Sequence, residues 1–149
     1  MGEEYSGLKV CSSIKKALKY KSEPIILKLK NKDLTSLPEN IGELQNVKVL
    51  NLAENRIKNF PKSFWQLKQL EVLIISDNGL DSLPKEIGSL EGLKKLYISR
   101  NYLSSIPTEI TNLKNLKTLD LSFNKLNDSD ADFIRKALPD CFVLVYMKL

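Results

Sequence analysis

The chain has 149 residues, of which 42% are hydrophobic and 28% are charged, a composition typical of a single soluble globular domain. It contains no histidine, which excludes the commonest general base and metal ligand of proteins. No apolar run approaches the roughly 20 residues of a membrane-spanning helix. The net charge is +5, but basic and acidic residues are interspersed, which indicates a dispersed polar surface.

Residues 1–23 are predicted to form an N-terminal capping helix. Apolar side chains recur there at helical spacing while lysines fall on the other side. The apolar positions are Leu8, Cys11, Ile14, Ala17 and Leu18. Pro24 would end the helix, whose apolar stripe would cover the open edge of the structure that follows. The acidic start at Glu3 and Glu4 is unlike a secretory signal, so no uncleaved signal peptide is expected.

Residues 24–127 repeat with a period of 23 residues. Each unit follows the pattern LxxLxLxxNxLxxLPxxIxxLxx, which is clearest from Leu70 to Gly92. A fixed period of this length predicts a stacked-repeat solenoid, in which the leucines of adjacent units cover one another. The units are residues 24–46, 47–69, 70–92, 93–115 and 116–138, the last of them degenerate.

The predicted fold class is α/β, with about five repeats followed by a terminal strand. Each unit is expected to contribute one short strand to a parallel sheet on the concave face. The prolines at positions 61, 84 and 107 mark where each unit turns into its return along the convex face. Trp65 stands where sister units carry glycine or threonine, and it is expected to pack on that convex side.

Residues 128–149 are predicted to form a C-terminal cap within the same structural domain. Ser129 to Asp132 resemble a capping box that opens a short helix, which Pro139 would stop. Counting 23 residues onward from Leu119 and Leu121 reaches Phe142 and Leu144, so residues 141–146 should add the last strand. Its exposed edge offers a route to weak end-to-end dimers; otherwise a monomer is expected.

An asparagine recurs where each predicted strand ends, at Asn55, Asn78, Asn101 and Asn124. A side-chain amide has two donors and an acceptor with two lone pairs, enough to link its own loop to that of the next repeat. We therefore expect a buried asparagine ladder. The first repeat departs from the pattern, because its equivalent position is Lys32.

No motif of catalysis, metal binding or cofactor binding stands out. Asp128, Asp130 and Asp132 alternate like the start of a calcium loop, but Phe133 stands where that loop requires glycine. No Gly-rich phosphate loop or serine nucleophile motif occurs. Cys11 and Cys141 are placed at opposite ends of the stack, too far apart for a disulfide. The chain is therefore predicted not to be an enzyme and to need no cofactor.

The repeat units resemble the leucine-rich repeat family in its 23-residue typical form, through the LPxxIxxL segments and the asparagine positions. The segment before the first repeat and the Ala-Leu-Pro-Asp-Cys sequence at 137–141 resemble small bacterial members. The resemblance implies a curved, right-handed solenoid whose concave face binds other proteins. Because such bacterial members are often exported, it also implies export if a signal peptide has been removed, and otherwise a cytoplasmic location.

The residues between the strand leucines point away from the core, and many of them are apolar or aromatic with Arg and Lys nearby. Such a patch is typical of a protein-binding surface, although β-branched and aromatic residues also favour strands for structural reasons. The predicted partner-binding residues are Val49, Val72, Ile74, Lys95, Tyr97, Arg100, Tyr102 and Phe123.

We therefore predict a non-catalytic protein-interaction module that binds a protein ligand through its concave strand face. The alternative is a structural or surface-associated protein that binds polyanions, such as glycan or nucleic acid, through its positive charge. Nucleic acid is the less favoured partner, because the lysines are scattered rather than interleaved with base-stacking aromatics along one stripe.

Overall fold

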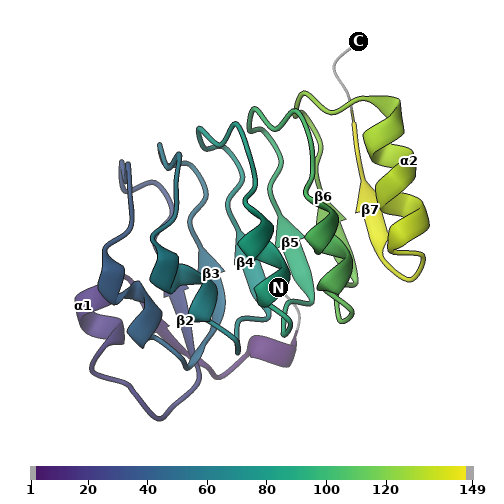
Figure 1. Cartoon of the computed structure of the whole chain (residues 1–149). Coiled ribbons are helices and arrows are strands. Elements are labelled where there is room, and N and C mark those ends of the chain that lie inside the picture. The colour runs from purple at the N-terminus through teal and green to yellow at the C-terminus, as the bar shows by residue number, and fades with distance from the viewer. Residues whose placement is uncertain (1–2, 147–149) are drawn as a thin grey trace.

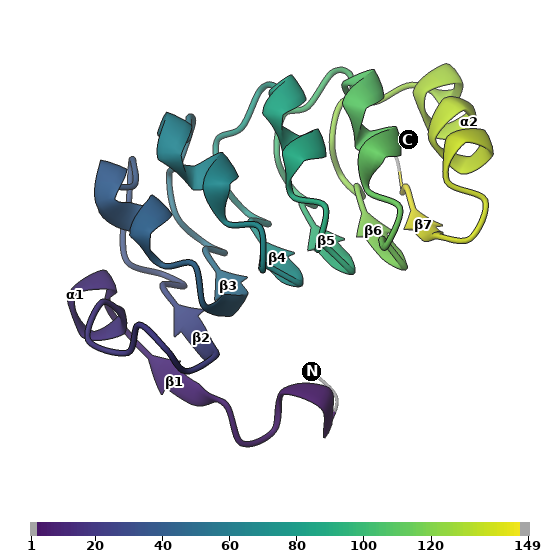
Figure 2. The same cartoon turned by 60° about the horizontal axis from the view of Figure 1, so that its bottom comes forward.

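The structure is a computed structural model that describes residues 3–146, and it forms one curved stack of repeats (Figures 1 and 2). Within this range the strands form a single open parallel sheet in the order of the chain, as the solenoid prediction requires. The strands are β1 (Lys9–Cys11), β2 (Ile25–Lys28), β3 (Val47–Asn51), β4 (Val72–Ile74), β5 (Lys95–Tyr97), β6 (Thr118–Asp120) and β7 (Phe142–Leu144).

Short 3-10 helices cover the convex side, opposite the strands (Figure 2). Each follows a proline whose fixed φ sets the start of the turn, as in η4 after Pro84 at φ −72°. These helices are η2 (Glu39–Glu43), η3 (Lys62–Gln66), η4 (Lys85–Ser89) and η5 (Thr108–Asn112). The sequence prolines therefore mark the turn from the strand side to the convex side, as predicted.

The core is the stack of leucines between the two sides. Leu73 lies opposite Leu50 on one neighbouring strand and opposite Leu96 on the other, and all three are fully buried. A single hydrophobic cluster extends from Cys11 near one end to Leu138 near the other. Because no unit could bury these side chains alone, stacking is what makes each unit stable.

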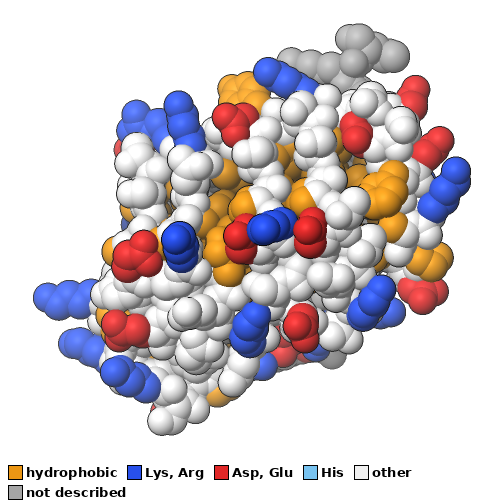
Figure 3. All heavy atoms as spheres, viewed as in Figure 1, with side chains coloured by type: hydrophobic (Ala, Val, Ile, Leu, Met, Phe, Trp, Pro, Cys, Tyr) orange, Lys and Arg blue, Asp and Glu red, His pale blue; other side chains and the backbone are white. Residues whose placement is uncertain are grey.

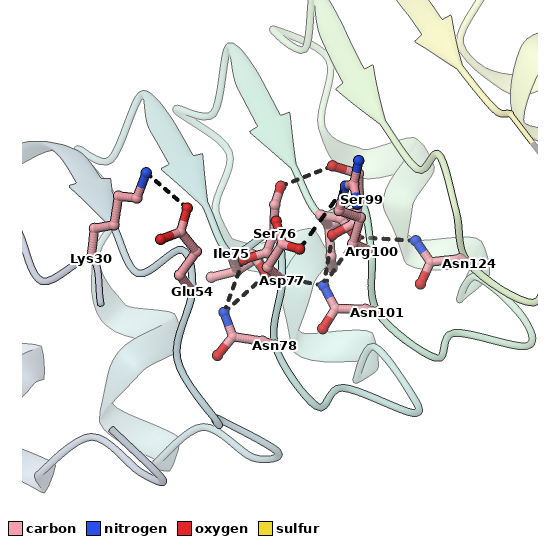
Figure 4. A network of polar contacts seen from close by, with 11 residues as sticks. Lys30, Glu54, Ile75, Ser76, Asp77, Asn78, Ser99, Arg100, Asn101 and Asn124 are labelled. Atoms are coloured by element: carbon pink, nitrogen blue, oxygen red, sulfur yellow. Dashed lines mark hydrogen bonds and ion pairs between the residues drawn. The ribbon is translucent and has the colours of Figure 1, made fainter. Parts of the chain in front are cut away.

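The four repeated asparagines each bind two turns of the stack together (Figure 4). Asn78 donates to the carbonyl oxygens of Leu52 at 3.0 Å and Ile75 at 3.2 Å, and its Oδ1 accepts from the Ile57 N–H at 2.9 Å. Two of these partners belong to the preceding repeat. The ladder thus connects each loop backward along the chain, not forward to the next repeat as the sequence analysis expected.

The backward direction explains why the first repeat has no asparagine at the ladder position. Asn55 supplies the amide for that turn from the second repeat, accepting from the N–H groups of Lys32 and Leu34 at 3.0 Å each. The segment before the first repeat is a cap without an equivalent loop. An amide at Lys32 would therefore lack the partners that its sister residues have.

The N-terminal cap is a strand and one turn of helix, so the predicted single helix is wrong. β1 pairs in parallel with β2, and α1 (Ile14–Ala17) follows, with the Ser13 hydroxyl accepting from the Lys16 N–H. The first strand of a solenoid would otherwise leave a row of unpaired backbone groups, and β1 satisfies them. Cys11 and Ala17 are fully buried, and they cover the end of the core as a cap should.

The C-terminal cap is a helix and a strand, as predicted, but with two differences. Helix α2 (Asp128–Ala137) has its capping box two residues earlier than expected, with Asn127 as N-cap and Asp130 at the third position. In β7 the residue opposite Leu119 is Val143, not Phe142. This shift of one residue turns the strand over, so Phe142 lies on the exposed face and Val143 against the core.

Glycine and tryptophan alternate on the convex side, where successive 3-10 helices pack. A Cβ at Gly42 would lie 2.6 Å from the carbonyl oxygen of Ser63, and one at Gly88 would lie 2.7 Å from that of Glu109. Trp65 occupies the position between these two glycines in the stack. It is only 8% exposed and packs edge-on against Phe60 and Phe64, which makes it a core residue on the convex side.

We expect Asn78→Ala to lower the free energy of unfolding by about 2 to 4 kcal/mol, because it leaves several buried backbone groups without partners at roughly 1 to 3 kcal/mol each. Urea denaturation followed by circular dichroism measures the difference. The exposed Asn59→Ala is the matched control and should change stability by less than about 0.5 kcal/mol. Equal midpoints for the two variants would contradict the ladder.

We also expect Gly88→Ala to cost about 1 to 3 kcal/mol, because the added methyl group meets backbone that cannot move away without separating two repeats. Gly79→Ala is the control, since its nearest neighbour is the flexible Lys58 side chain at 3.4 Å. Thermal unfolding of both variants tests this. A Gly79→Ala variant as destabilised as Gly88→Ala would show that steric contact is not the cause.

Candidate functional site

An N-terminal strap, residues 3–8, crosses the concave side of the sheet. Its first turn, η1 (Glu3–Tyr5), lies away from β1 on the strand side of the molecule (Figure 2). Glu4 pairs with Lys94 and the Tyr5 hydroxyl donates to Glu71, two residues that directly precede β5 and β4, so η1 lies well along the stack from the cap to which the strap belongs. The strap therefore returns over the first strands, and it covers part of the surface that the sequence analysis assigned to a partner.

Tyr5 anchors the strap in an apolar pit on the concave face. Its side chain is only 5% exposed and forms a hydrophobic cluster with Ile26, Val49 and Val72, which is separate from the main core. Val49 and Val72 were predicted to contact a partner, but they are fully covered, so the expectation that they are exposed is wrong. The cause is a tyrosine outside the repeats, whose position no repeat spacing could indicate.

A polar cluster closes the pit at the tip of the Tyr5 ring. The Tyr5 hydroxyl donates to Glu71 Oε2 at 3.0 Å, and the ammonium groups of Lys48 and Lys94 lie 3.0 and 2.8 Å from the same carboxylate. Lys94 also pairs with Glu4 of the strap at 2.7 Å. Lys48 lies in β3, while Glu71 and Lys94 directly precede β4 and β5. The two lysines hold the Glu71 carboxylate, and Lys94 also holds the strap.

These contacts shift the protonation equilibria of the cluster. Burial of Glu71 opposes its ionisation, but the hydrogen bonds from Lys94, Lys48 and Tyr5 outweigh it and lower the pKa of this carboxyl to about 2. Burial, together with the hydrogen bond to Glu71, raises the pKa of Tyr5 to about 12. Hydrogen bonds to Glu4 and Glu71 raise the pKa of Lys94. At neutral pH the cluster is therefore held as carboxylate, ammonium and neutral phenol.

A second feature, the aromatic ledge, lies at the carboxyl ends of β5 to β7 and is left open by the strap. We define it by Arg100, Tyr102, Phe123, Lys125 and Tyr146. The rings of Tyr102, Phe123 and Tyr146 are 55%, 42% and 61% exposed. Arg100, Tyr102 and Phe123, together with Asp77 and Asn101, line a shallow hollow of about 380 Å³. Three large exposed rings side by side are unusual for a surface without a partner.

Contacts within the ledge fix the positions of its rings. The Arg100 guanidinium lies 5.0 Å from the centre of the Phe123 ring, and Lys125 Nζ lies 5.2 Å from that of Tyr102. Tyr146 stacks on Phe123 with ring centres 6.5 Å apart. Arg100 also approaches Asp77 of the preceding repeat at 4.0 Å (Figure 4). The ledge is therefore ordered before any partner arrives.

The backbone of the turn explains why these side chains project outward. The residue before each ladder asparagine has a left-handed conformation, with φ 55° at Arg100 and 58° at Phe123. This bend turns the asparagine inward and directs its neighbours to the rim of the sheet. Glu54 and Asp77, which precede Asn55 and Asn78, have the same left-handed conformation, with φ 56° and 55°.

The eight predicted partner-binding residues thus fall into three groups. Val49 and Val72 are buried beneath Tyr5, and Ile74, Tyr97 and Lys95 are half-buried beside the pit. Arg100, Tyr102 and Phe123 lie together on the open ledge.

Sequence reasoning missed both ends of the site, the strap and Tyr146. A signal for the polar cluster was present, because Lys48, Glu71 and Lys94 occupy the same repeat position and alternate in charge. Tyr146 was assigned to the last strand but not to the partner-binding residues, although counting 23 residues onward from Phe123 reaches it, and the Phe123 N–H donates to its carbonyl oxygen.

Among residues 3–146, no group of three or more metal-ligating side chains comes together, and no helix is long and apolar enough to cross a membrane. Cys141 is half-buried, and burial raises the pKa of its thiol, which disfavours the reactive thiolate.

Glu71→Gln should lower stability at pH 7 by about 1 to 3 kcal/mol, because charge-assisted hydrogen bonds to three donors are lost. A carboxyl whose folded pKa lies below its ordinary value stabilises the fold above that ordinary value, about 4.5, and loses this contribution as the pH falls toward 2. The gap between wild type and variant should therefore narrow between pH 5 and pH 2.5 in urea denaturation.

The control for this experiment is Glu54→Gln. Glu54 pairs with Lys30 at 2.8 Å, but both side chains are about half exposed, at 47% and 51%. Its substitution should change stability less at pH 7, because water screens an exposed pair. Parallel stability curves for wild type and Glu71→Gln across this pH range would disprove the assigned role of Glu71.

Comparison with known proteins places the fold. The profile of the leucine-rich repeat region matches residues 16–143. Comparison with curated protein sequences gives no match. A leucine-rich repeat protein of Leptospira interrogans has a similar structure, with 34% identity and a TM-score of 0.61, over 78% of this chain and 34% of that chain.

Two further structures widen the range of relatives. Internalin C2 of Listeria monocytogenes shares the fold at a TM-score of 0.73 and 24% identity, over 92% of this chain and 57% of its own. The ectodomain of the receptor kinase GASSHO1/SCHENGEN3 of Arabidopsis thaliana has a TM-score of 0.66 and 29% identity, over 83% of this chain and 15% of its own. The chain thus spans about a third of the Leptospira protein and little more than half of internalin C2. With the family profile covering most of its length, the chain belongs to the leucine-rich repeat family.

Proposed function

We propose that this protein is a non-catalytic interaction module that binds a protein partner through the aromatic ledge. The observation that carries the proposal is the group of three exposed rings held in place by Arg100 and Lys125. Aromatic and arginine side chains supply most of the binding free energy at protein interfaces. Because the rings are already ordered, little conformational entropy is lost when a partner docks on them.

The comparisons support a role in binding. The GASSHO1/SCHENGEN3 ectodomain was solved in complex with CASPARIAN STRIP INTEGRITY FACTOR 2, so a solenoid of this kind can hold a protein ligand. The family as a whole favours recognition over catalysis. We extend this to the present chain, with the ledge as the contact surface and the identity of the partner open.

The charge distribution favours a protein partner over a polyanion. On the face seen in Figure 3, basic and acidic side chains alternate without a continuous basic surface. Several lysines and arginines are also engaged with acidic residues, as in the pairs Lys30–Glu54 and Arg56–Asp33. A protein that bound along a phosphate or sulfate backbone would be expected to carry unpaired Lys and Arg side chains along one groove.

The test is a pull-down with the immobilised full chain against the double variant Tyr102→Ala, Phe123→Ala. We expect the double variant to retain less than about a tenth of the specifically captured partner, because truncating central aromatic contacts costs well over 1 kcal/mol. Its melting temperature should remain close to that of the wild type, since both rings are exposed. Tyr97 is left unchanged, because it packs against the Tyr5 cluster.

The matched control is Phe133→Ala, which removes a ring that is 39% exposed on helix α2, outside the ledge. It should capture the partner as the wild type does. Capture by the ledge variant at the wild-type level would refute the proposal. A loss of all capture between 50 and 200 mM salt would instead favour the polyanion alternative, since phosphate contacts are strongly salt-dependent.

A further inference from the structure

The pit beneath the strap binds the adjacent side chains of Glu4 and Tyr5 through different contacts. The carboxylate of Glu4 is paired with Lys94 at 2.7 Å, while the ring of Tyr5 fills the apolar pit over Val49 and Val72. The hydroxyl of Tyr5 then donates to Glu71 at 3.0 Å. The ammonium group of Lys94, the apolar floor of the pit and the carboxylate of Glu71 are therefore arranged to bind an acidic residue followed by a tyrosine.

The acceptor makes the pit selective for the phenol. Glu71 is held as a carboxylate by Lys48 and Lys94, and it faces the ring tip with a remaining lone pair. A phenylalanine would fill the pit but would bring no donor to this carboxylate. A phosphorylated tyrosine would bring a dianion against Glu71, and like charges at this distance repel.

The strap is attached in a way that allows it to leave the pit. Strand pairing to the sheet begins only at Lys9, and the contacts before Gly7 include the ion pair of Glu4 with Lys94 and the packing of Tyr5 in the pit, while Leu8 packs against the same cluster after it. It joins β1 through Gly7, which has φ +94° and open space around its Cα. The cluster under Tyr5 is also separate from the main core, so the stack of leucines does not depend on it.

We propose that this concave pit is a binding site for a segment of a partner polypeptide in which an acidic residue precedes a tyrosine, and that Glu4 and Tyr5 occupy it in cis. The strap is then an intramolecular competitor, and the partner segment binds when the strap swings out about Gly7. The site lies over β3 to β5, apart from the aromatic ledge, and it stands whether or not the ledge binds a partner.

The experiment uses the full chain with Tyr5→Ala, which empties the pit, and a fluorescein-labelled synthetic peptide with the sequence of residues 2–8. Fluorescence anisotropy should show saturable binding to the variant. Binding to the wild type should be at least about tenfold weaker, because its own tyrosine occupies the site most of the time. Circular dichroism checks that the variant is folded. Full-chain Glu4→Lys, which repels Lys94 without leaving a cavity, is the second opened variant and should bind with intermediate affinity.

Substitutions in the peptide and the protein test the chemistry. The peptide with Tyr5→Ala should not bind, the Tyr5→Phe peptide should bind several-fold more weakly, and the phosphotyrosine peptide at least about tenfold more weakly. Removing the peptide carboxylate by Glu4→Ala should weaken binding to the opened protein, but not when Lys94→Ala is also present. Such coupling is expected for two groups that contact each other.

Three results would overturn the proposal. The first is no binding of the peptide at millimolar concentration to either folded, opened variant. The second is equal affinity for wild type and Tyr5→Ala, which would place the peptide elsewhere on the surface. The third is a concentration-dependent wild-type dimer in light scattering that is absent in Tyr5→Ala, with no peptide binding, which would make a second copy of the chain the occupant.

Discussion

The hydrogen bonds of the asparagine ladder are the constraint on which the rest of the structure depends. Each amide closes its own turn and, at the same time, satisfies backbone groups of the preceding repeat, as Asn101 does with Ile75 and Leu80. Because each amide contacts both its own turn and the preceding one, the turns of neighbouring repeats must stay in register. The regular spacing of 23 residues keeps both the asparagines and the leucines of neighbouring repeats in this register.

The same turn determines where the recognition surface lies. The left-handed residue before each asparagine turns the chain at the end of the strand, so the side chains around it stand on the rim. Where these are Arg100 and Phe123 the rim becomes a ledge of rings and cations, and where they are Glu54 and Asp77 it carries ion pairs. One backbone conformation therefore yields different surfaces along the stack, according to the residue it presents.

The sequence was sufficient wherever the period applied. The leucine contacts, the positions of the ladder and the exposed state of Arg100, Tyr102 and Phe123 follow from counting within a repeat. The wrong predictions concern segments outside the repeats. The apolar spacing from Leu8 to Ile14 fits a helix as well as a short strand and turn, because a three-residue strand is too short to show alternation. Helix α2 changes the spacing before β7, and a shift of one residue is enough to exchange the faces of a strand.

The strap shows why exposed apolar positions in a repeat need not indicate a partner. Ile26, Val49 and Val72 form a continuous row on the concave face, and the chain itself supplies the residue that covers them. The carboxylate at the rim of this pit is already neutralised by Lys48 and Lys94, so it does not need the strap to avoid an unpaired charge. The pit would therefore keep its polar arrangement when Tyr5 leaves, whereas the apolar row would then be exposed to water. Exposing that row to water costs free energy, so in the proposed competition the pit would be filled by whichever tyrosine fits it better, that of the strap or that of the partner.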